Sequence, residues 1–295
     1  MGCPHCESAD TKERRERTKL GYRRFRCRTC QREFNERTGT SFNHLQYPTD
    51  VVCLMVLWRV RYKLSLRDLP EMFLERGLVF SHEAVREWEA QLAPQLSETL
   101  RKLRRGRIGP SWYVDETFIK VKGRSVYLYR AIDHDGYLVD VRLSEKRDKA
   151  AAEAFFRSAR MVTGCVPERV TSDGHAAYPH TIRAVFGKEV RHRTNRYFNN
   201  YLEQDQRGIK QRIQPMGGFK SVESATRFCR AHDEVRNFLR PRSYRNTAAA
   251  LYGPYPCPSN LLGGSIKRTG SEAPARLYFL LGRILTQSKF ANGRQ

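Results

Sequence analysis

Three β-type runs follow one another between residues 112 and 143, and they constrain the fold of this 295-residue chain more than any other feature. Gly123 and the Asp135-Gly136 pair separate the runs, and such residues favour the tight turns that join antiparallel strands. A helical pattern, a fourth short strand at Arg169–Ser172 and further alternating elements come next. The order β-β-β-α-β-α-β-α therefore predicts an α/β domain built on a mixed sheet.

This order is that of an RNase H-like fold, and it gives three acidic residues notable positions. Asp115 lies within the first strand, Asp173 at the C-terminal end of the fourth, and Glu203 on a long helix that begins near Phe198. In this fold the first and fourth strands are neighbours and the late helix packs beside them, so we expect the three carboxylates to converge. The adjacent Glu116 is expected to point to the opposite face of its strand.

A cluster of carboxylates at neutral pH requires a divalent cation, and Mg²⁺ (or Mn²⁺) suits oxygen ligands. Two such ions can activate the attacking oxygen of a phosphodiester reaction and stabilise the leaving oxygen. Alternatives remain open at two positions. Asp173 with Gly174 can form a turn only, and Asp205 competes with Glu203 for the place on the helix.

The charge of the chain indicates a polyanionic partner. Its formal net charge is +23, from 54 Lys and Arg against 31 Asp and Glu. Contacts with phosphates release counterions, so we expect strongly salt-dependent binding to DNA. A ribosomal or membrane-surface protein is the alternative. The sequence has no apolar run long enough to span a membrane and no secretory signal, so no membrane partner and a cytoplasmic, nucleoid-associated location are expected.

Two Cys-x2-Cys pairs near the N-terminus, separated by twenty residues, predict a zinc ribbon. The four cysteines are Cys3, Cys6, Cys27 and Cys30. Two such pairs can close a tetrahedron of thiolates around Zn²⁺, which would supply much of the folding free energy of so short a segment. We expect two short hairpins, one for each pair. His5 and His44 are alternative ligands, and the arginines between the pairs are expected to contact phosphate.

A helix-turn-helix is predicted after this segment. One helix opens after Pro48, a second after Ser65, and Ser81 can cap a third that runs to about Leu92. The second helix of such a motif can enter a major groove. The candidate groove residues are His82, Glu83, Arg86 and Glu87. A helical hairpin with no role in DNA binding is the alternative.

The connection to the catalytic region is basic and contains no acidic residue, so we expect it to be exposed and to follow phosphates. Its basic residues are Arg101, Lys102, Arg104, Arg105 and Arg107. The predicted organisation is a zinc ribbon (1–46), a helix-turn-helix domain (47–100), a basic linker (101–110), an RNase H-like catalytic domain (111–240) and a basic C-terminal tail (241–295).

Several spaced motifs resemble the insertion-sequence-six family of bacterial transposases. They include WYVDETFIKV, YLYRAIDHDG, TSDGHAAY and NNYLEQDQRGIKQR, and the resemblance runs from about residue 47 to about residue 238. It implies that Asp115, Asp173 and Glu203 are the DDE triad of a transposase.

The resemblance also carries expectations about the late helix. It implies that Lys210, two helical turns beyond Glu203, contacts DNA near the active site, with Arg207 as a further candidate. The family often has His where Gln206 stands, and a change in DNA contact is expected there.

The predicted function is DNA transposition. The zinc ribbon and helix-turn-helix would bind the terminal inverted repeats of an element, and the acidic site would cleave its 3′ ends and join them to target DNA. The resemblance implies a replicative route through a cointegrate and at least a homodimer, because two ends must be processed together. The alternatives are a catalytically inactive DNA-binding regulator and an RNase H-like nuclease that hydrolyses DNA without joining it.

Overall fold

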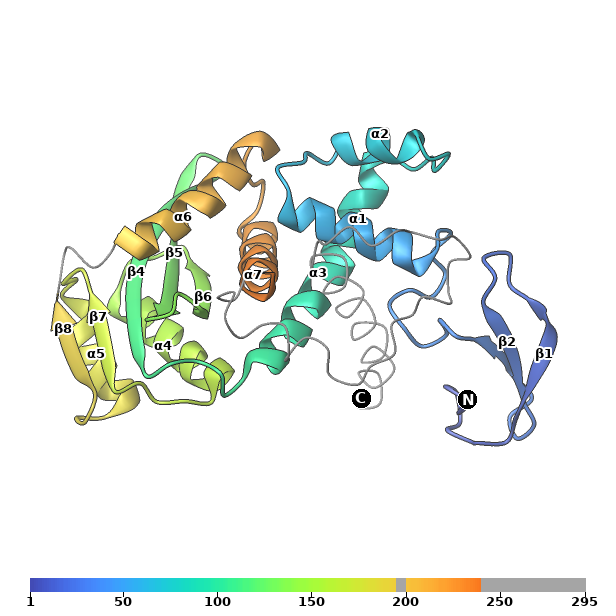
Figure 1. Cartoon of the computed structure of the whole chain (residues 1–295), viewed down its shortest axis with the longest axis horizontal. Coiled ribbons are helices and arrows are strands. Elements are labelled where there is room, and N and C mark those ends of the chain that lie inside the picture. The colour runs from blue at the N-terminus through green and yellow to red at the C-terminus, as the bar shows by residue number, and fades with distance from the viewer. Residues whose placement is uncertain (195–199, 240–295) are drawn as a thin grey trace, which may run out of the picture.

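The computed structural model describes residues 1–194 and 200–239. The predicted C-terminal tail lies outside the described residues, and so does the side chain of Glu203, although its helix is described. Along the long axis of Figure 1, a small β-sheet, a group of helices and a larger mixed sheet follow one another. Within the described ranges, no helix has both the length and the apolar character that crossing a membrane requires.

The larger sheet has the strand order β6-β5-β4-β7-β8. Its first three strands, β4 (Ser111–Val121), β5 (Arg124–Asp133) and β6 (Leu138–Ser144), pair antiparallel. Strand β7 (Arg169–Ser172) pairs parallel with β4, and β8 (Arg191–Thr194) pairs parallel with β7. This topology confirms the predicted RNase H-like fold.

Helices cover both faces of the sheet. On one face lie α4 (Lys149–Thr163) and α5 (Ala177–Phe186), which pack against β4, β5 and β6 around buried aromatic side chains. On the other face lie α6 (Asn200–Ile213) and α7 (Val222–Phe238). Successive side chains of a strand point to opposite faces, so β4 and β5 each contribute to both apolar cores.

The helical part consists of α1 (Thr49–Arg61), α2 (Asp68–Leu74) and α3 (His82–Arg104). Its apolar core also takes in side chains of α7, which lies between these helices and the large sheet in Figure 1. The predicted cap at Ser81 is confirmed, because its hydroxyl accepts a hydrogen bond from the Ala84 N–H at 3.2 Å. Helix α7 therefore joins the helical part to the sheet.

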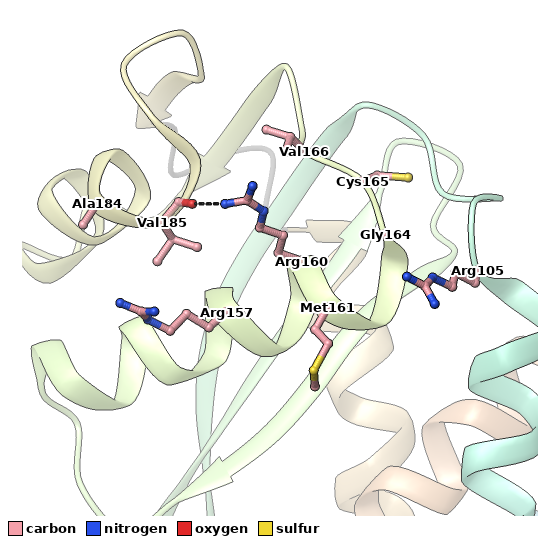
Figure 2. A pocket seen from close by; sticks show the side chains of 9 residues that line it. All are labelled: Arg105, Arg157, Arg160, Met161, Gly164, Cys165, Val166, Ala184 and Val185. Atoms are coloured by element: carbon pink, nitrogen blue, oxygen red, sulfur yellow. Dashed lines mark hydrogen bonds between the residues drawn. The ribbon is translucent and has the colours of Figure 1, made fainter.

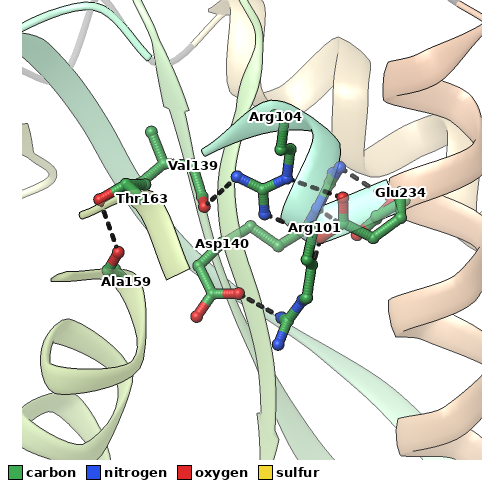
Figure 3. A network of polar contacts seen from close by, with 9 residues as sticks. Arg101, Arg104, Val139, Asp140, Ala159, Thr163 and Glu234 are labelled. Atoms are coloured by element: carbon green, nitrogen blue, oxygen red, sulfur yellow. Dashed lines mark hydrogen bonds and ion pairs between the residues drawn. The ribbon is translucent and has the colours of Figure 1, made fainter. Parts of the chain in front are cut away.

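The predicted exposed linker is wrong over its first residues, because α3 does not end near Leu92 but continues to Arg104. Arg101 and Arg104 are buried and point to Glu234 of α7 (Figure 3). Arg104 binds both carboxylate oxygens of Glu234 at 2.7 Å, and Arg101 also pairs with the buried Asp140 of β6. Arg104 is thus a structural residue, and its predicted role in DNA binding is wrong.

The small sheet contains β1 (Thr11–Arg17), β2 (Arg23–Cys27) and β3 (Glu33–Asn35), paired antiparallel in that order. The expected arrangement of two hairpins, one for each cysteine pair, is only half correct. The second pair lies in the turn between β2 and β3, whereas the first lies in a turn that precedes β1. The apolar core here is small, with Phe25 stacked on Phe34.

His232 of α7 supplies a pH dependence of stability. Its side chain is 3% exposed, and burial lowers its pKa to about 3 although the carbonyl of Val60 accepts a hydrogen bond from its ring. Below pH 6.5 only the unfolded chain takes up this proton, so stability is lost as the pH falls from about 6.5 toward 3. Between pH 6.5 and 5 we expect a loss of about 2 kcal/mol in the free energy of unfolding from this group. Urea unfolding of the wild type and His232→Gln measures it, and equal pH slopes in the two proteins would contradict the assignment.

Candidate active site

Asp115 and Asp173 lie side by side on neighbouring strands. The parallel register of β4 and β7 places Tyr113 opposite Thr171, so Asp115 and Asp173, each two residues further on, lie level with one another. Asp173 comes directly after the last residue of β7. The structure therefore brings these two predicted residues together at the end of the short strand.

The carboxylates of Asp115, Asp173 and Glu116 form one cluster, with one oxygen of each within 4.8 Å of the others. Asp115 accepts hydrogen bonds from the Gln206 side chain and from the Glu116 N–H, each at 2.9 Å. Burial raises the pKa of Asp115 to about 6, and the charges of Asp173 and Glu116 add to this effect, against the Gln206 hydrogen bond, which lowers it. Such crowding favours a divalent cation, which would compensate the carboxylate charges.

Glu116 takes part in this cluster, which the sequence analysis did not anticipate. It leaves the strand on the face opposite Asp115, as expected, and meets Tyr178 of α5 and Arg147 of the β6–α4 connection. The pairing of β4 with β7 ends at Tyr113, and just beyond this point the glutamate carboxylate approaches the two aspartates. Although the side chains of Asp115 and Glu116 leave opposite faces of β4, their carboxylates therefore lie close together where the pairing of β4 with β7 ends.

Glu203 lies on α6, whose backbone packs beside β4, but its side chain lies outside the described residues. Gln206 stands three residues further along the same helix, and positions three apart share a helix face. Since Gln206 reaches Asp115, Glu203 lies on the side of α6 that faces the cluster. Gln206 is 7% exposed and binds Asp115, and the expected change in DNA contact at this position stays a prediction.

Lys210 and Arg207 are exposed near the end of α6. The ammonium of Lys210 lies 5.3 Å from the ring centroid of Phe118, an aromatic residue of β4 that is 54% exposed. An exposed aromatic ring beside a cation is a surface that nucleic acid can contact by stacking and by charge. The DNA contacts predicted for Lys210 and Arg207 remain predictions.

His82 and Arg86 stand at the start of α3, where the sequence analysis placed the groove contacts. Both pair with the intervening acid Glu83. Val85 and Trp88 of the same helix are buried, as expected for residues of the core. In the absence of DNA, the Glu83 carboxylate therefore contacts both His82 and Arg86, the two basic side chains expected to enter a major groove.

Arg105 faces a hollow of about 580 Å³ beside the C-terminal end of α4 (Figure 2). Arg157 and Arg160 line the same hollow, but each has a partner: Arg157 pairs with Glu153, and Arg160 donates to the Val185 carbonyl. No residue of the carboxylate cluster lines it. A DNA contact by Arg105 would therefore lie apart from the acidic site.

The four predicted cysteine ligands converge in the small N-terminal sheet. The sulfur atoms of Cys3 and Cys30 are 3.6 Å apart, as are those of Cys6 and Cys27, and all four lie within 4.8 Å. A tetrahedron of Zn–S bonds of about 2.3 Å has sulfur separations of about 3.8 Å. The Cys30 N–H also donates to the Cys27 sulfur and lowers the pKa of Cys27 to about 6. The cluster thus fits a zinc ribbon.

The chain is similar to a known domain family and to several known proteins. The family DDE_Tnp_IS240, described as a DDE domain, matches residues 109–242. The transposase for insertion sequence-like element IS431mec of Staphylococcus aureus (strain N315) is 37% identical over 175 residues, 58% of this chain and 77% of that protein. The transposase for insertion sequence element IS257 in transposon Tn4003 of Staphylococcus aureus has the same identity and coverage. The HTLV-2 integrase catalytic core with magnesium, in its trimeric form, aligns at a TM-score of 0.35 and 18% identity over 43% of this chain and 86% of that chain.

A DDE domain carried on an RNase H-like sheet defines a polynucleotidyl transferase, an enzyme that acts on nucleic acid strands with a divalent metal. Within this class, the similarity to the two transposases places the chain among enzymes that move DNA elements. This chain belongs to the insertion-sequence-six family of DNA transposases.

Proposed function

We propose that this transposase binds the terminal inverted repeats of an insertion element, cleaves its 3′ ends and joins them to target DNA, by a replicative route through a cointegrate. The observation that carries the proposal is the level placement of Asp115 and Asp173 on neighbouring strands, with Gln206 of α6 bonded to Asp115. Two ends must be processed together, so the working form would be a homodimer or a higher oligomer.

Asp115, Asp173 and Glu203 would hold two Mg²⁺ (or Mn²⁺) ions. The oxygen donors suit these cations, and burial, together with the charges of Asp173 and Glu116, raises the pKa of Asp115. When bound, the ions would activate the attacking oxygen and stabilise the leaving oxygen. The chain itself would contribute orientation: the Gln206 amide binds the Asp115 carboxylate, and the exposed Lys210 and Arg207 would bind phosphates.

The proposed chemistry has two displacements at phosphorus. Water first attacks the phosphate at the 3′ end of the element, and the P–O3′ bond breaks to release a 3′-OH. This 3′-OH then attacks a target phosphate, the target P–O3′ bond breaks, and a target 3′-OH leaves. Neither step needs a covalent bond to the protein.

The test is a product analysis. Full-length protein and Mg²⁺ are mixed with labelled DNA that carries the element ends and with a plasmid target. Labelled strands joined to the plasmid are the expected product. Cleavage without joining would instead identify a nuclease, and binding without either would identify a regulator.

We further propose that residues 1–46 bind Zn²⁺ through Cys3, Cys6, Cys27 and Cys30, and that this unit and the helices of residues 47–100 grip the element ends. Exposed arginines of β1 and β2 would contact phosphates, although several also pair with nearby glutamates. His82 and Arg86 would read the major groove once Glu83 releases them.

Removal of zinc is expected to unfold the N-terminal unit and leave the rest of the chain folded. Its four-residue apolar cluster is too small to hold three strands without the metal. Hydrogen exchange should show protection lost in β1–β3 on chelation or in Cys27→Ser, and retained in β4–β7. Cys165→Ser, which alters a partly buried thiol outside the cluster, is the control. Protection retained in β1–β3 without zinc would overturn the proposal.

A further inference from the structure

Arg147 lies at the carboxylate cluster, and the proposed chemistry gives it no role. It precedes α4, and its Nε donates to the Glu116 carboxylate at 2.6 Å while one terminal nitrogen contacts the same oxygen. Burial alone would lower the pKa of Arg147, but the hydrogen bond and charge of Glu116 and the charge of Asp173 raise it. The Arg147 guanidinium is therefore held next to the carboxylate cluster by its contacts with Glu116.

Glu116 is held from two sides. One carboxylate oxygen binds Arg147, and the other accepts a hydrogen bond from the hydroxyl of Tyr178, whose side chain is fully buried. The Glu116 side chain is itself 3% exposed. Both of its oxygens thus have protein partners, and its charge is compensated by Arg147. Asp115 and Asp173 have no cationic side chain bonded to them in the described part of the chain.

Arg147 remains open to solvent on its other side. Its side chain is 42% exposed, and among the described residues its second terminal nitrogen makes no hydrogen bond. A guanidinium offers five N–H donors in a fixed plane, so one edge can bind a carboxylate while another binds a phosphate. Because Glu116 belongs to the same cluster as Asp115 and Asp173, a phosphodiester there would lie beside the side chain that binds Arg147.

We propose that Arg147 binds a non-bridging oxygen of the DNA phosphate that occupies the carboxylate cluster, and that Glu116 and Tyr178 are positioning residues that hold its guanidinium there. The inference rests on the proposed joining reaction. In this proposal the Glu116 carboxylate binds Arg147 and is not a metal ligand, although it belongs to the carboxylate cluster. A phosphate contact of this kind adds affinity for any DNA sequence.

The test compares Arg147→Gln, Arg147→Lys and Glu116→Gln with the wild type. Arg157→Gln is the matched control, because it removes the same charge from an exposed arginine of α4 paired with Glu153. DNA binding is measured by fluorescence anisotropy at several salt concentrations with Ca²⁺ as the cation, and Mn²⁺ binding by calorimetry without DNA. Strand joining is measured at saturating DNA.

Loss of one charge-assisted contact corresponds to a decrease of roughly 10- to 100-fold in joining for Arg147→Gln. The slope of log K for DNA binding against log salt concentration should become shallower by the equivalent of about one phosphate contact. The affinity for Mn²⁺ should not decrease. Arg147→Lys should recover the slope but only part of the joining. Glu116→Gln should reduce joining without weakening Mn²⁺ binding, whereas Arg157→Gln should resemble the wild type.

Two results would overturn the proposal. A tenfold or greater loss of Mn²⁺ affinity in Glu116→Gln would make Glu116 a metal ligand. An unchanged salt slope and unchanged joining in Arg147→Gln would remove the phosphate contact. Because the binding measurements need no catalysis, absence of joining in the wild type would refute the proposed function and leave the contact of Arg147 to be decided by the slope.

Discussion

Asp173→Asn is expected to reduce strand joining by roughly 10³-fold or more while DNA binding is retained. The substitution keeps the shape of the side chain and the oxygen that accepts the His175 N–H, but it removes a charge from the carboxylate cluster. Metal ions contribute several kcal/mol to stabilising such a reaction, and each 1.4 kcal/mol corresponds to a factor of ten in rate.

Single-turnover assays with labelled element ends measure this loss. Asp135→Asn is the matched control, because Asp135 lies exposed in the β5–β6 turn and its carboxylate contacts the neighbouring His134. Near wild-type joining by Asp173→Asn would exclude Asp173 from the site. An equal loss in both variants would indicate a general effect of charge.

Glu234→Gln is expected to lower the free energy of unfolding by roughly 3–5 kcal/mol, the range for breaking a buried ion pair from one side. Glu234 is fully buried and binds Arg101 and Arg104 of α3 (Figure 3). The neutral amide would remove the carboxylate that Arg104 binds and would leave Arg101 paired with Asp140. Because this network joins α3 to the sheet, its loss would also loosen the helical part from the catalytic domain.

Urea unfolding in saturating Zn²⁺ measures this change. Glu98→Gln is the control on the same helix, since Glu98 pairs with Lys102 in an exposed position. Exposed pairs of this kind contribute at most about 0.5 kcal/mol. A change in Glu234→Gln as small as that in Glu98→Gln would contradict the anchoring role of the network.

The sequence was sufficient to predict the order of the sheet and the placement of two of the three acids. The periodicities of β4 to β7 and the turn residues at Gly123 and Gly136 are local signals, and the chain order of an RNase H-like domain then makes β4 and β7 neighbours. The spacing of the cysteine pairs is equally local, because each pair occupies one turn.

The errors concern contacts between segments far apart in the chain. The arginines at the end of α3 look like an exposed basic linker until Glu234, more than a hundred residues later, is placed beside them. Helix amphipathicity carried one usable signal, because Arg104 lies four and eight residues after the buried Leu100 and Leu96 and so shares their helix face. The length of α3 could therefore have been predicted, but the partners of its arginines could not.

The role of Gln206 and the association of Glu116 with Arg147 and Tyr178 also depend on long-range packing. Gln206 stands three residues after Glu203, so its place on the same face of α6 was available from the sequence. Its hydrogen bond to Asp115 was not, because it depends on how closely α6 packs on β4. Glu116 and Arg147 are separated by two strands, and only the folded sheet brings them together.

The site at Asp115 and Asp173 is proposed to bind the divalent cation on which joining depends. Calorimetric titration of Mn²⁺ into zinc-loaded full-length protein tests it without DNA or catalysis. We expect binding to the wild type and an affinity at least tenfold lower in Asp115→Asn, with the control Asp135→Asn unchanged. Equal Mn²⁺ affinity in the wild type and Asp115→Asn would show that Asp115 does not bind the cation.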